Sequence, residues 1–285
     1  MKSAHIRTFL VAATLILCLE SAHSQPRDTI SAQQGMLTKM YYGAVKSLAW
    51  YDFPIVAADL AQIAFVPGNL ANKLIRYPPS NFDKNLQVHV GVPGSRSIIG
   101  QISEAGAAAI LGTRLLANVG FDLVGGNVTS RDYHRTFWFY KSIVYTYSLT
   151  LLTKNIVFRV RPDGSDSQSF FSAHSSTAFC AASYLSLELN DWYGRWGATR
   201  SNDALRSSLK LGSKIVLYAG ATYVAYARMH DEKHYFSDVA VGAVVGTVVG
   251  RLMYQWQWSN DSLFDQNLSF FVVDKTPTIF YTLHF

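Results

Sequence analysis

The sequence is poor in charged residues and in cysteine, and it contains no dense basic run. Only 15% of its residues are charged, whereas 49% are hydrophobic. This composition excludes an intrinsically disordered chain and supplies enough apolar material for the core of one domain or two. The formal charge of +6 is a modest excess. Because the basic residues are not clustered as in typical nucleic-acid-binding proteins, we expect no nucleic-acid partner.

The first 24 residues have the three parts of a secretory signal peptide. Lys2 and Arg7 form a basic start, Phe9–Leu19 is an apolar run, and Ala22–Ser24 fits a small-x-small cleavage site. The run has about half the length that spans a bilayer, so a retained anchor is the less favoured alternative. The mature chain would then begin near Gln25. We expect an exported protein, periplasmic or outer-membrane-associated in a Gram-negative bacterium and otherwise secreted.

Cleavage would leave Cys180 as the only cysteine, which excludes an intrachain disulfide. We therefore expect Cys180 to be a buried apolar side chain. Residues 25–36 are polar without apolar periodicity, which is typical of a flexible leader.

Helical periodicity dominates residues 37–258, which predicts an all-α helical bundle. The expected helices are Leu37–Trp50, Ile55–Leu74, Ser97–Val119, Asp132–Val160, Ser175–Leu189, Ala204–Met229 and Tyr235–Trp258. Loops are expected at Pro78–Pro79, Gly91–Gly94, Gly125–Asn127, Asp163–Gly164 and Trp192–Asp203.

Long hydrophobic runs are absent from this helical region. Ile215–Ala227 and Val239–Gly250 are both bounded by charged residues, and both are shorter than the roughly 18–20 residues of a spanning helix. A water-soluble or peripheral bundle is therefore favoured, with a membrane-embedded bundle left open because charges of an active site can interrupt spanning helices.

The C-terminal segment, residues 259–285, changes to an alternating pattern. Leu268–Val273, a turn at Asp274–Pro277 and Thr278–Phe285 predict a β-hairpin. An isolated hairpin is marginal in stability, so we expect it to pack on its own domain. Its terminal aromatic residue also resembles the ends of outer-membrane proteins, which keeps association with that membrane open.

Three segments combine basic residues, histidines and hydroxyl residues, and the first contains Lys154 and Arg161. These lie seven positions apart, which on one helix places both on the same face about 10 Å apart along the axis. Pro162 disfavours helical backbone at Arg161 and so puts it at a helix end. Both cations can then reach one anion. Taken alone, such residues are more often solvated partners of the helix dipole.

The second segment, Phe171–Thr177, opens an apolar helix with small hydroxyl residues that are good N-caps. A helix N-terminus offers free N–H groups and a positive dipole end, which can hold a phosphate. His174 would stand beside that anion as a proton carrier. Taken alone, it is more often an ordinary helix-start histidine.

The third segment contains Arg228, His234 and Asp238. The last two are four positions apart and are neighbours if the segment is helical. A carboxylate bonded to one imidazole nitrogen leaves the other with a free lone pair, so a neutral histidine becomes a usable nucleophile. Arg228 would add a phosphate ligand. An ordinary helix-surface pair is the alternative.

Together, the patterns Lys-x6-Arg-Pro, Ser-x-His and Arg-x5-His-x3-Asp resemble the type 2 phosphatidic acid phosphatase superfamily. It includes bacterial acid phosphatases, lipid phosphatases and vanadium haloperoxidases on a shared helical bundle. The resemblance covers about residues 130–255. It implies that phosphate is bound by Lys154, Arg161, Arg228, Ser172 and the Ala173 N–H group. It further implies that His234 is the nucleophile, that Asp238 orients it, and that His174 protonates the leaving oxygen and later activates water.

Three residues depart from the family pattern. Phe171 stands where the family usually has proline, Ala173 where it has glycine, and Ala227 where it often has serine. Alanine adds a methyl group near the phosphate and tolerates positive φ poorly, so we expect a displaced or slower donor loop. Every charged group of the pattern is present, so these departures are interpreted as modulators of activity.

The resemblance implies a phosphatase without metal or other cofactor, for which vanadate would be a phosphate-mimicking inhibitor. Lipid phosphates or diphosphates are the favoured substrates, and peripheral membrane association would accompany them. Three alternatives stay open: a soluble non-specific acid phosphatase, a vanadium haloperoxidase, and a non-catalytic envelope or membrane-binding protein that retains the fold. The remaining histidines form no metal-ligand pattern, because His230 and His234 lack the glutamate of a zinc motif.

Overall fold

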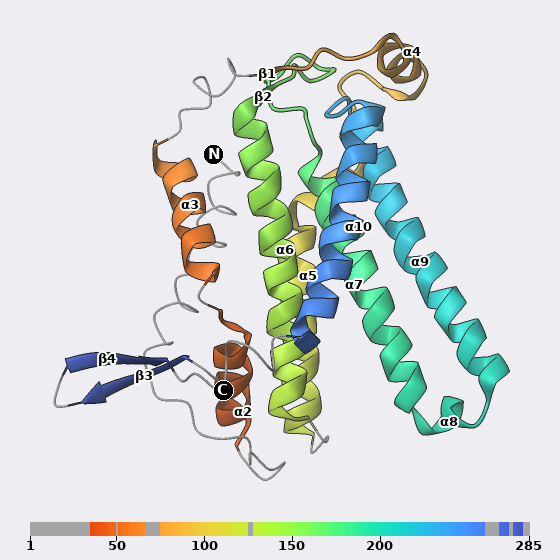
Figure 1. Cartoon of the computed structure of the whole chain (residues 1–285). Coiled ribbons are helices and arrows are strands. Elements are labelled where there is room, and N and C mark those ends of the chain that lie inside the picture. Colours follow the sequence, from red (N-terminus) through yellow and green to blue (C-terminus); the bar gives the residue numbers. More distant parts are fainter. Residues whose placement is uncertain are drawn as a thin grey trace. The chain divides into compact units, whose positions relative to one another are not determined.

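The computed structural model describes residues 35–49, 51–65, 75–124, 128–259, 268–273 and 276–281 (Figure 1). The expected signal peptide and residues 25–34 of the expected leader lie outside these residues. The chain divides into two compact units. Unit 1 comprises Met1–Leu60, Ala108–Lys141 and Gln255–Phe285, and unit 2 comprises Ala61–Ala107 and Ser142–Tyr254.

The described part of the chain is mainly helical, which confirms the expected all-α fold. The helices are α2 (Met36–Ser47), α3 (Asp52–Phe65), α4 (Asn81–Val90), α5 (Ile98–Leu123), α6 (Ser130–Ile156), α7 (Ala173–Arg195), α8 (Gly197–Arg200), α9 (Asp203–His230) and α10 (Phe236–Ser259). The strands are β1 (Ile75–Arg76), β2 (Val157–Phe158), β3 (Leu268–Val273) and β4 (Thr276–Tyr281).

Unit 1 is built around an aromatic cluster on the N-terminal half of α6. Tyr133 and Phe137 are buried with Val128, and apolar side chains of α2 and α5 pack against them. Gly43 of α2 is needed for this contact, since a Cβ there would lie 2.5 Å from the Cβ of Tyr133. A buried ion pair of 2.8 Å between Lys39 and Asp122 joins α2 to α5.

The C-terminal residues form the expected β-hairpin. β3 and β4 are antiparallel, with Leu268 paired to Tyr281 and Val273 paired to Thr276. The second strand therefore begins within the expected turn. Residues 282–285 of the expected second strand lie outside the described residues.

Unit 2 is organised around α7, α9 and α10. Figure 1 shows α7 and α9 as an antiparallel pair connected through α8. α10 approaches α7 through a row of glycines at Gly242, Gly246 and Gly250, one on every fourth position. A Cβ on Gly246 would lie only 2.0 Å from the carbonyl oxygen of Ser176, so no side chain fits there.

The glycine row places the start of α10 against the start of α7. Asp238 lies one turn before Gly242, and its carbonyl oxygen accepts a hydrogen bond of 3.1 Å from the Ser172 amide. The backbone of Cys180 lies against Gly246 and Gly250. Its side chain is completely buried, which confirms the sequence expectation, and its thiol contacts Ser142 of α6.

α4 is a helix that the sequence patterns missed. Ser80 caps its N-terminus: the hydroxyl accepts from the Asp83 amide, and the Asp83 carboxylate accepts from the Ser80 amide. This Ser-x-x-Asp capping box after Pro79 is a readable signal for a helix start. α4 has only 10 residues, most of them polar, so it offers few positions for an apolar pattern, and this is why the helix was not expected.

Two expected boundaries are wrong. The helix expected over Asp132–Val160 ends at Ile156, because Val157 and Phe158 pair in parallel with Ile75 and Arg76. The loop expected at Trp192–Asp203 is largely helical, since α7 continues to Arg195 and α8 follows it. Residues 66–74 of the helix expected over Ile55–Leu74 lie outside the described residues.

One helix among the described residues, Phe236–Gln257, is long and apolar enough to cross a membrane by length and composition. Its sequence includes Asp238 and Arg251, the residues that we took as limits of the apolar run. A third of the most apolar part is buried. Core helices of soluble proteins have the same properties, so this feature alone is weak support for a membrane span.

Candidate functional site

Lys154 and Arg161 lie on different kinds of backbone, one within α6 and the other after it. Lys154 is in the last turn of α6, is nearly buried, and its ammonium group donates to the carbonyl oxygen of Gln168. Arg161 follows β2 in a short loop, where its amide donates to Asp166. Its guanidinium contacts the Asp166 carboxylate at 2.7 Å. The two cations therefore do not share a helix face, contrary to the sequence expectation.

Arg159 is a buried residue of the candidate site that the sequence analysis did not single out. It is 1% exposed, and its guanidinium forms ion pairs of 2.8 Å with Asp83 and 2.9 Å with Asp238. It also donates to the Ser237 hydroxyl at 2.9 Å. The rings of Tyr77 and Tyr235 lie 4.7 and 5.0 Å from its central carbon. No local pattern reveals this role, because Asp83 is 76 positions away; the only signal is an arginine two residues before the expected ligand.

Asp83 extends this network from α4 to the first turn of α10. Its two carboxylate oxygens accept hydrogen bonds from the amide and the hydroxyl of Ser237, at 3.0 and 2.8 Å. These bonds lower the pKa of Asp83 against the opposing effect of burial. The carboxylate is therefore ionised at neutral pH and pairs with Arg159 as an anion.

The N-terminus of α7 presents Ser172, Ala173 and His174. Ser172 is fully buried and is the N-cap, with its hydroxyl 3.4 Å from the Ser175 amide. Ala173 and His174 are the first two residues of the helix, so their N–H groups have no intrahelical acceptor. These N–H groups and the helix dipole are available to an anion at this point.

Arg228, His234 and Asp238 lie in the last turn of α9, in the turn that follows it and in the first turn of α10. Arg228 lies in the last turn of α9 and is 5% exposed. His234 precedes α10, so the two residues do not share a helix, although their side chains are neighbours. Its Nδ1 atom lies 2.7 Å from the carbonyl oxygen of Ser169 and 3.8 Å from the Asp238 carboxylate.

Asp238 is fully buried, and each of its carboxylate oxygens has a defined neighbour. One oxygen accepts from the Ser169 hydroxyl at 2.5 Å and from the Tyr235 amide at 2.8 Å. The other oxygen lies 2.9 Å from the Arg159 guanidinium. Ser169 therefore contacts both His234 and Asp238, through its carbonyl and its hydroxyl respectively.

The structure brings the predicted charged residues within electrostatic reach of one another. Burial, followed by the charge of Arg228, lowers the pKa of His174 well below its usual value. Burial, followed by the charge of Lys154, does the same for His234. Burial and the neighbouring Arg161 lower the pKa of Lys154 to about 7. The site is thus a crowded group of cations around two neutral imidazoles. A bound anion would reduce the repulsion among these cations.

None of the residues that depart from the family pattern has a positive φ. Phe171 and Ala227 are buried, with 3% exposure each. Among the described non-glycine residues, only Glu232 has a positive φ. Ala173 is therefore in ordinary helical backbone, and the expected conflict between alanine and a positive φ does not arise.

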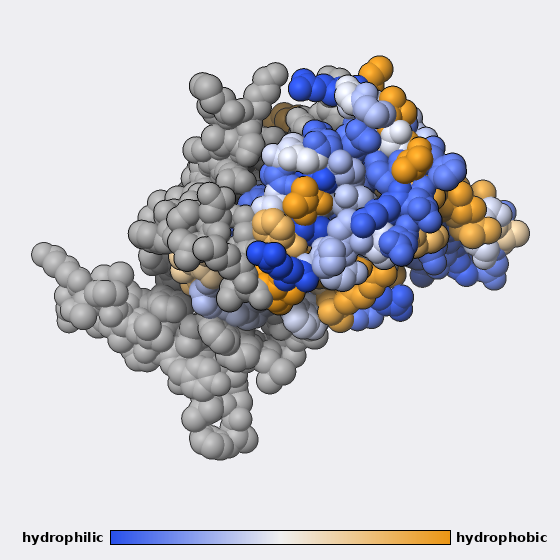
Figure 2. All heavy atoms as spheres, turned by 90° about the horizontal axis from the view of Figure 1, so that it is seen from above, coloured by the Kyte–Doolittle hydropathy of each residue, from blue (hydrophilic) through white to orange (hydrophobic). Residues whose placement is uncertain are grey.

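The described residues include no group of three or more His, Cys, Asp or Glu side chains that is placed to hold a metal ion. The described surface seen in Figure 2 is mainly hydrophilic, with isolated hydrophobic side chains. The cations that the sequence pattern assigns to phosphate binding are Lys154, Arg161 and Arg228.

Comparison with known proteins finds similarity to the family that the sequence motifs resemble. Residues 135–262 match the model of the PAP2 superfamily. A lipid A 1-phosphatase of Porphyromonas gingivalis is 32% identical over 109 residues, which is 37% of this chain and 19% of that protein. The chain thus covers about a fifth of the length of this curated relative. No solved structure gives a significant match.

Proposed function

We propose that this chain, whose residues 135–262 form a PAP2 superfamily domain, is a metal-independent phosphatase that cleaves phosphate esters, preferably those of lipids. The observation that carries the proposal is the environment of His234. A carbonyl oxygen can only accept, so the contact of 2.7 Å with Ser169 requires a proton on Nδ1. The lone pair of Nε2 is then free for attack on phosphorus, within a cluster of cations.

In the proposed reaction, Lys154, Arg161 and Arg228 balance the charge of the phosphate group. The Ser172 hydroxyl and the Ala173 N–H group donate to its oxygens. Phosphoryl transfer requires dispersed negative charge to be stabilised, and fixed cations meet this requirement as metal ions do elsewhere.

The chemistry has two steps. In the first, Nε2 of His234 forms a bond to phosphorus while the bond to the alcohol oxygen breaks, and His174 gives that oxygen its proton. In the second, His174 takes a proton from water, the water oxygen bonds to phosphorus, and the phosphohistidine bond breaks to release phosphate. Asp238 supports the positive charge that develops on the His234 ring.

His174 must carry a proton for the first step, although the surrounding cations disfavour it in the empty site. A bound phosphate dianion reverses this effect, because its charge opposes that of the cations. The proton would therefore arrive with the substrate.

Lipid phosphates are the preferred substrate class because the related protein carries the name lipid A 1-phosphatase. We also propose that the chain acts outside the cytoplasm, where its N-terminal segment would direct it. A soluble acid phosphatase is the second candidate. A panel of lipid and soluble phosphate esters, assayed with and without detergent, separates the two.

The direct test is phosphate release by the purified protein in the presence of a chelator. We expect full activity with EDTA, inhibition by vanadate, and no turnover by the His234→Ala variant. Acid-labile radioactive phosphate on the protein after quenching would identify the phosphohistidine. Activity that requires an added divalent metal, or that survives in His234→Ala, would contradict the mechanism. Absence of any phosphate release would favour the non-catalytic alternative.

A further inference from the structure

The loop that follows β2 holds Arg161 through two contacts with one residue, Asp166. The Arg161 amide donates to the Asp166 carbonyl oxygen at 3.0 Å, and the Arg161 Nε donates to the Asp166 carboxylate at 2.7 Å. The same carboxylate oxygen accepts from the Gln168 amide at 2.8 Å. Gln168 is fixed in turn, because its carbonyl oxygen accepts from the ammonium group of Lys154. Asp166 therefore links the two cations of this part of the site.

The other end of the Arg161 guanidinium lies beside the turn that carries His234. Its Nη1 atom is 3.5 Å from the carbonyl oxygen of Lys233, the residue directly before His234. The charge of Arg161 lowers the pKa of His234, after the larger effects of burial and of Lys154. Nη2 has no hydrogen-bond partner among the described residues. The guanidinium thus keeps donors for an anion at this point.

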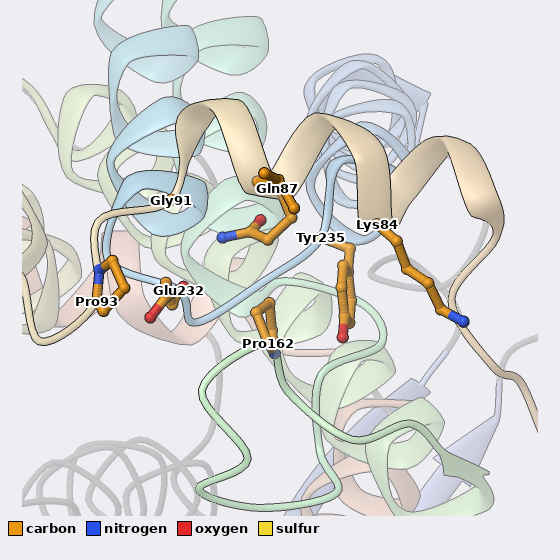
Figure 3. Close-up of a pocket in the computed structure, with 8 residues that line it drawn as sticks. Lys84, Gln87, Gly91, Pro93, Pro162, Glu232 and Tyr235 are labelled. Carbon is orange, nitrogen blue, oxygen red and sulfur yellow. The ribbon is translucent and has the colours of Figure 1, made fainter.

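The loop and the turn are also joined by contacts that do not involve Asp166. The Asp163 amide donates to the Glu232 carbonyl oxygen at 3.1 Å, and the Asp163 carboxylate pairs with Lys233 at 2.5 Å. Figure 3 shows Pro162 on the loop and Glu232 on the turn, and both line one pocket of about 380 Å³. Loss of the Asp166 carboxylate should therefore free the arginine side chain while the loop stays joined to the turn.

An arginine that is already held binds an anion more tightly than one that must first be ordered. A free arginine side chain has many rotamers, and ordering it upon binding costs free energy. In this loop Asp166 orders the side chain before the anion arrives. The carboxylate also repels a phosphate, but its side chain is 45% exposed, so water screens that repulsion. The ordering effect should therefore be the larger one.

We propose that Asp166 is a positioning residue of the phosphate site. It holds the guanidinium of Arg161 by its Nε atom and so presents the remaining N–H groups to the substrate phosphate. The proposal rests on the proposed phosphatase function and adds to it a residue that lies outside the three sequence motifs. Because Asp166 acts through Arg161 and does not touch the reacting atoms, its loss should weaken substrate binding and leave the chemical step nearly unchanged.

Two substitutions separate the hydrogen bond of Asp166 from its charge. Asp166→Asn keeps an oxygen that can accept from Arg161, whereas Asp166→Ala removes it. With phenyl phosphate as substrate, Asp166→Ala should raise KM about tenfold and change kcat less than about twofold. Asp166→Asn should raise KM less than about threefold. Asp203→Ala removes a carboxylate from an exposed ion pair with Arg206 and is the matched control, which should change neither constant.

A double-mutant cycle tests whether Asp166 acts through Arg161. In the Arg161→Met protein, the further change Asp166→Ala should alter KM less than about twofold, since the side chain to be positioned is gone. Losses that multiply in the double variant would overturn the proposal, because they would show that Asp166 supports the loop itself. Equal losses in Asp166→Asn and Asp166→Ala would also overturn it, because the charge alone would then be responsible.

Anion binding without turnover separates this proposal from the proposed function. Sulfate is titrated by calorimetry into the wild type and the same variants. Its dissociation constant should be about tenfold higher in Asp166→Ala than in the wild type. That result in a protein that releases no phosphate would refute the phosphatase function alone. Unchanged sulfate affinity and KM in an active Asp166→Ala protein would refute the role of Asp166 alone. A wild type that neither binds sulfate nor releases phosphate would refute both.

Discussion

The Nδ1 atom of His234 is hydrogen-bonded to the carbonyl oxygen of Ser169, whereas the carboxylate of Asp238 lies 3.8 Å away. The backbone therefore sets the tautomer of the proposed nucleophile. Asp238 influences the His234 ring from a longer distance. It does so through its charge and through the hydrogen bond that it accepts from the Ser169 hydroxyl.

This arrangement predicts a graded effect of substitution at the carboxylate. In Asp238→Asn the tautomer of His234 should be retained, so the loss of kcat should be about 10²-fold, less than the loss of about 10⁴-fold that follows a wrong tautomer. His234→Ala should have no measurable turnover. Steady-state kinetics with trapping of the phosphohistidine checks both variants. A complete loss in Asp238→Asn, with the fold intact by circular dichroism, would show that the carboxylate itself holds the ring.

Arg159 should act as a positioning residue with no direct contact to substrate. Its planar guanidinium reaches Asp83, Asp238 and Ser237 together, which the single ammonium of a lysine cannot do. Arg159→Lys should lower kcat about tenfold with little change in KM, because the phosphate ligands are untouched. Arg200→Lys, an exposed arginine on α8, is the control. A change confined to KM would mean that Arg159 binds the substrate directly.

Removing the positive charge of Arg159 should also lower the free energy of unfolding. Arg159→Met leaves two buried carboxylates without their shared cation, which should cost about 3–5 kcal/mol of unfolding free energy. Urea denaturation measures the difference. The double variant Arg159→Met, Asp83→Asn should recover part of the loss, because one of the unpaired charges is removed. Losses that simply add would contradict the ion-pair network.

The helices and the charged residues of the site were predictable from sequence, because both depend on local patterns. Apolar periodicity and short spacings, such as that from Ser172 to His174, can be recognised in the sequence without knowledge of the fold. The partners of those residues were not predictable. Asp83, Arg159 and Ser169 act through contacts between distant segments, and β2 exists only because Val157 and Phe158 meet Ile75 and Arg76. The acceptor of the His234 proton is a backbone carbonyl, which leaves no sequence signal.

Anion binding should be coupled to uptake of protons. In the empty site His174 is neutral and the pKa of Lys154 is about 7. A bound dianion raises both pKa values, so roughly one proton should enter near pH 7. Calorimetry with sulfate in buffers of different ionisation enthalpy measures this number, since sulfate does not titrate there. Uptake should fall in His174→Asn, and uptake that is zero in the wild type would contradict the cation cluster.

The same cluster should destabilise the empty protein, and Lys154 offers the clearest test. Its pKa is lowered from 10.5 to about 7, so the unfolded state binds more protons between these values and stability rises with pH across that window. Below pH 7 the full cost of the buried charge is present. Lys154→Met should therefore stabilise the empty protein by about 1–2 kcal/mol at pH 6. The gain should shrink as pH approaches 10.5.

Thermal unfolding with and without sulfate measures both effects: sulfate should stabilise the wild type more than the Lys154→Met variant. A variant less stable than the wild type at pH 6 would mean that the bond from Lys154 to the Gln168 carbonyl outweighs the repulsion.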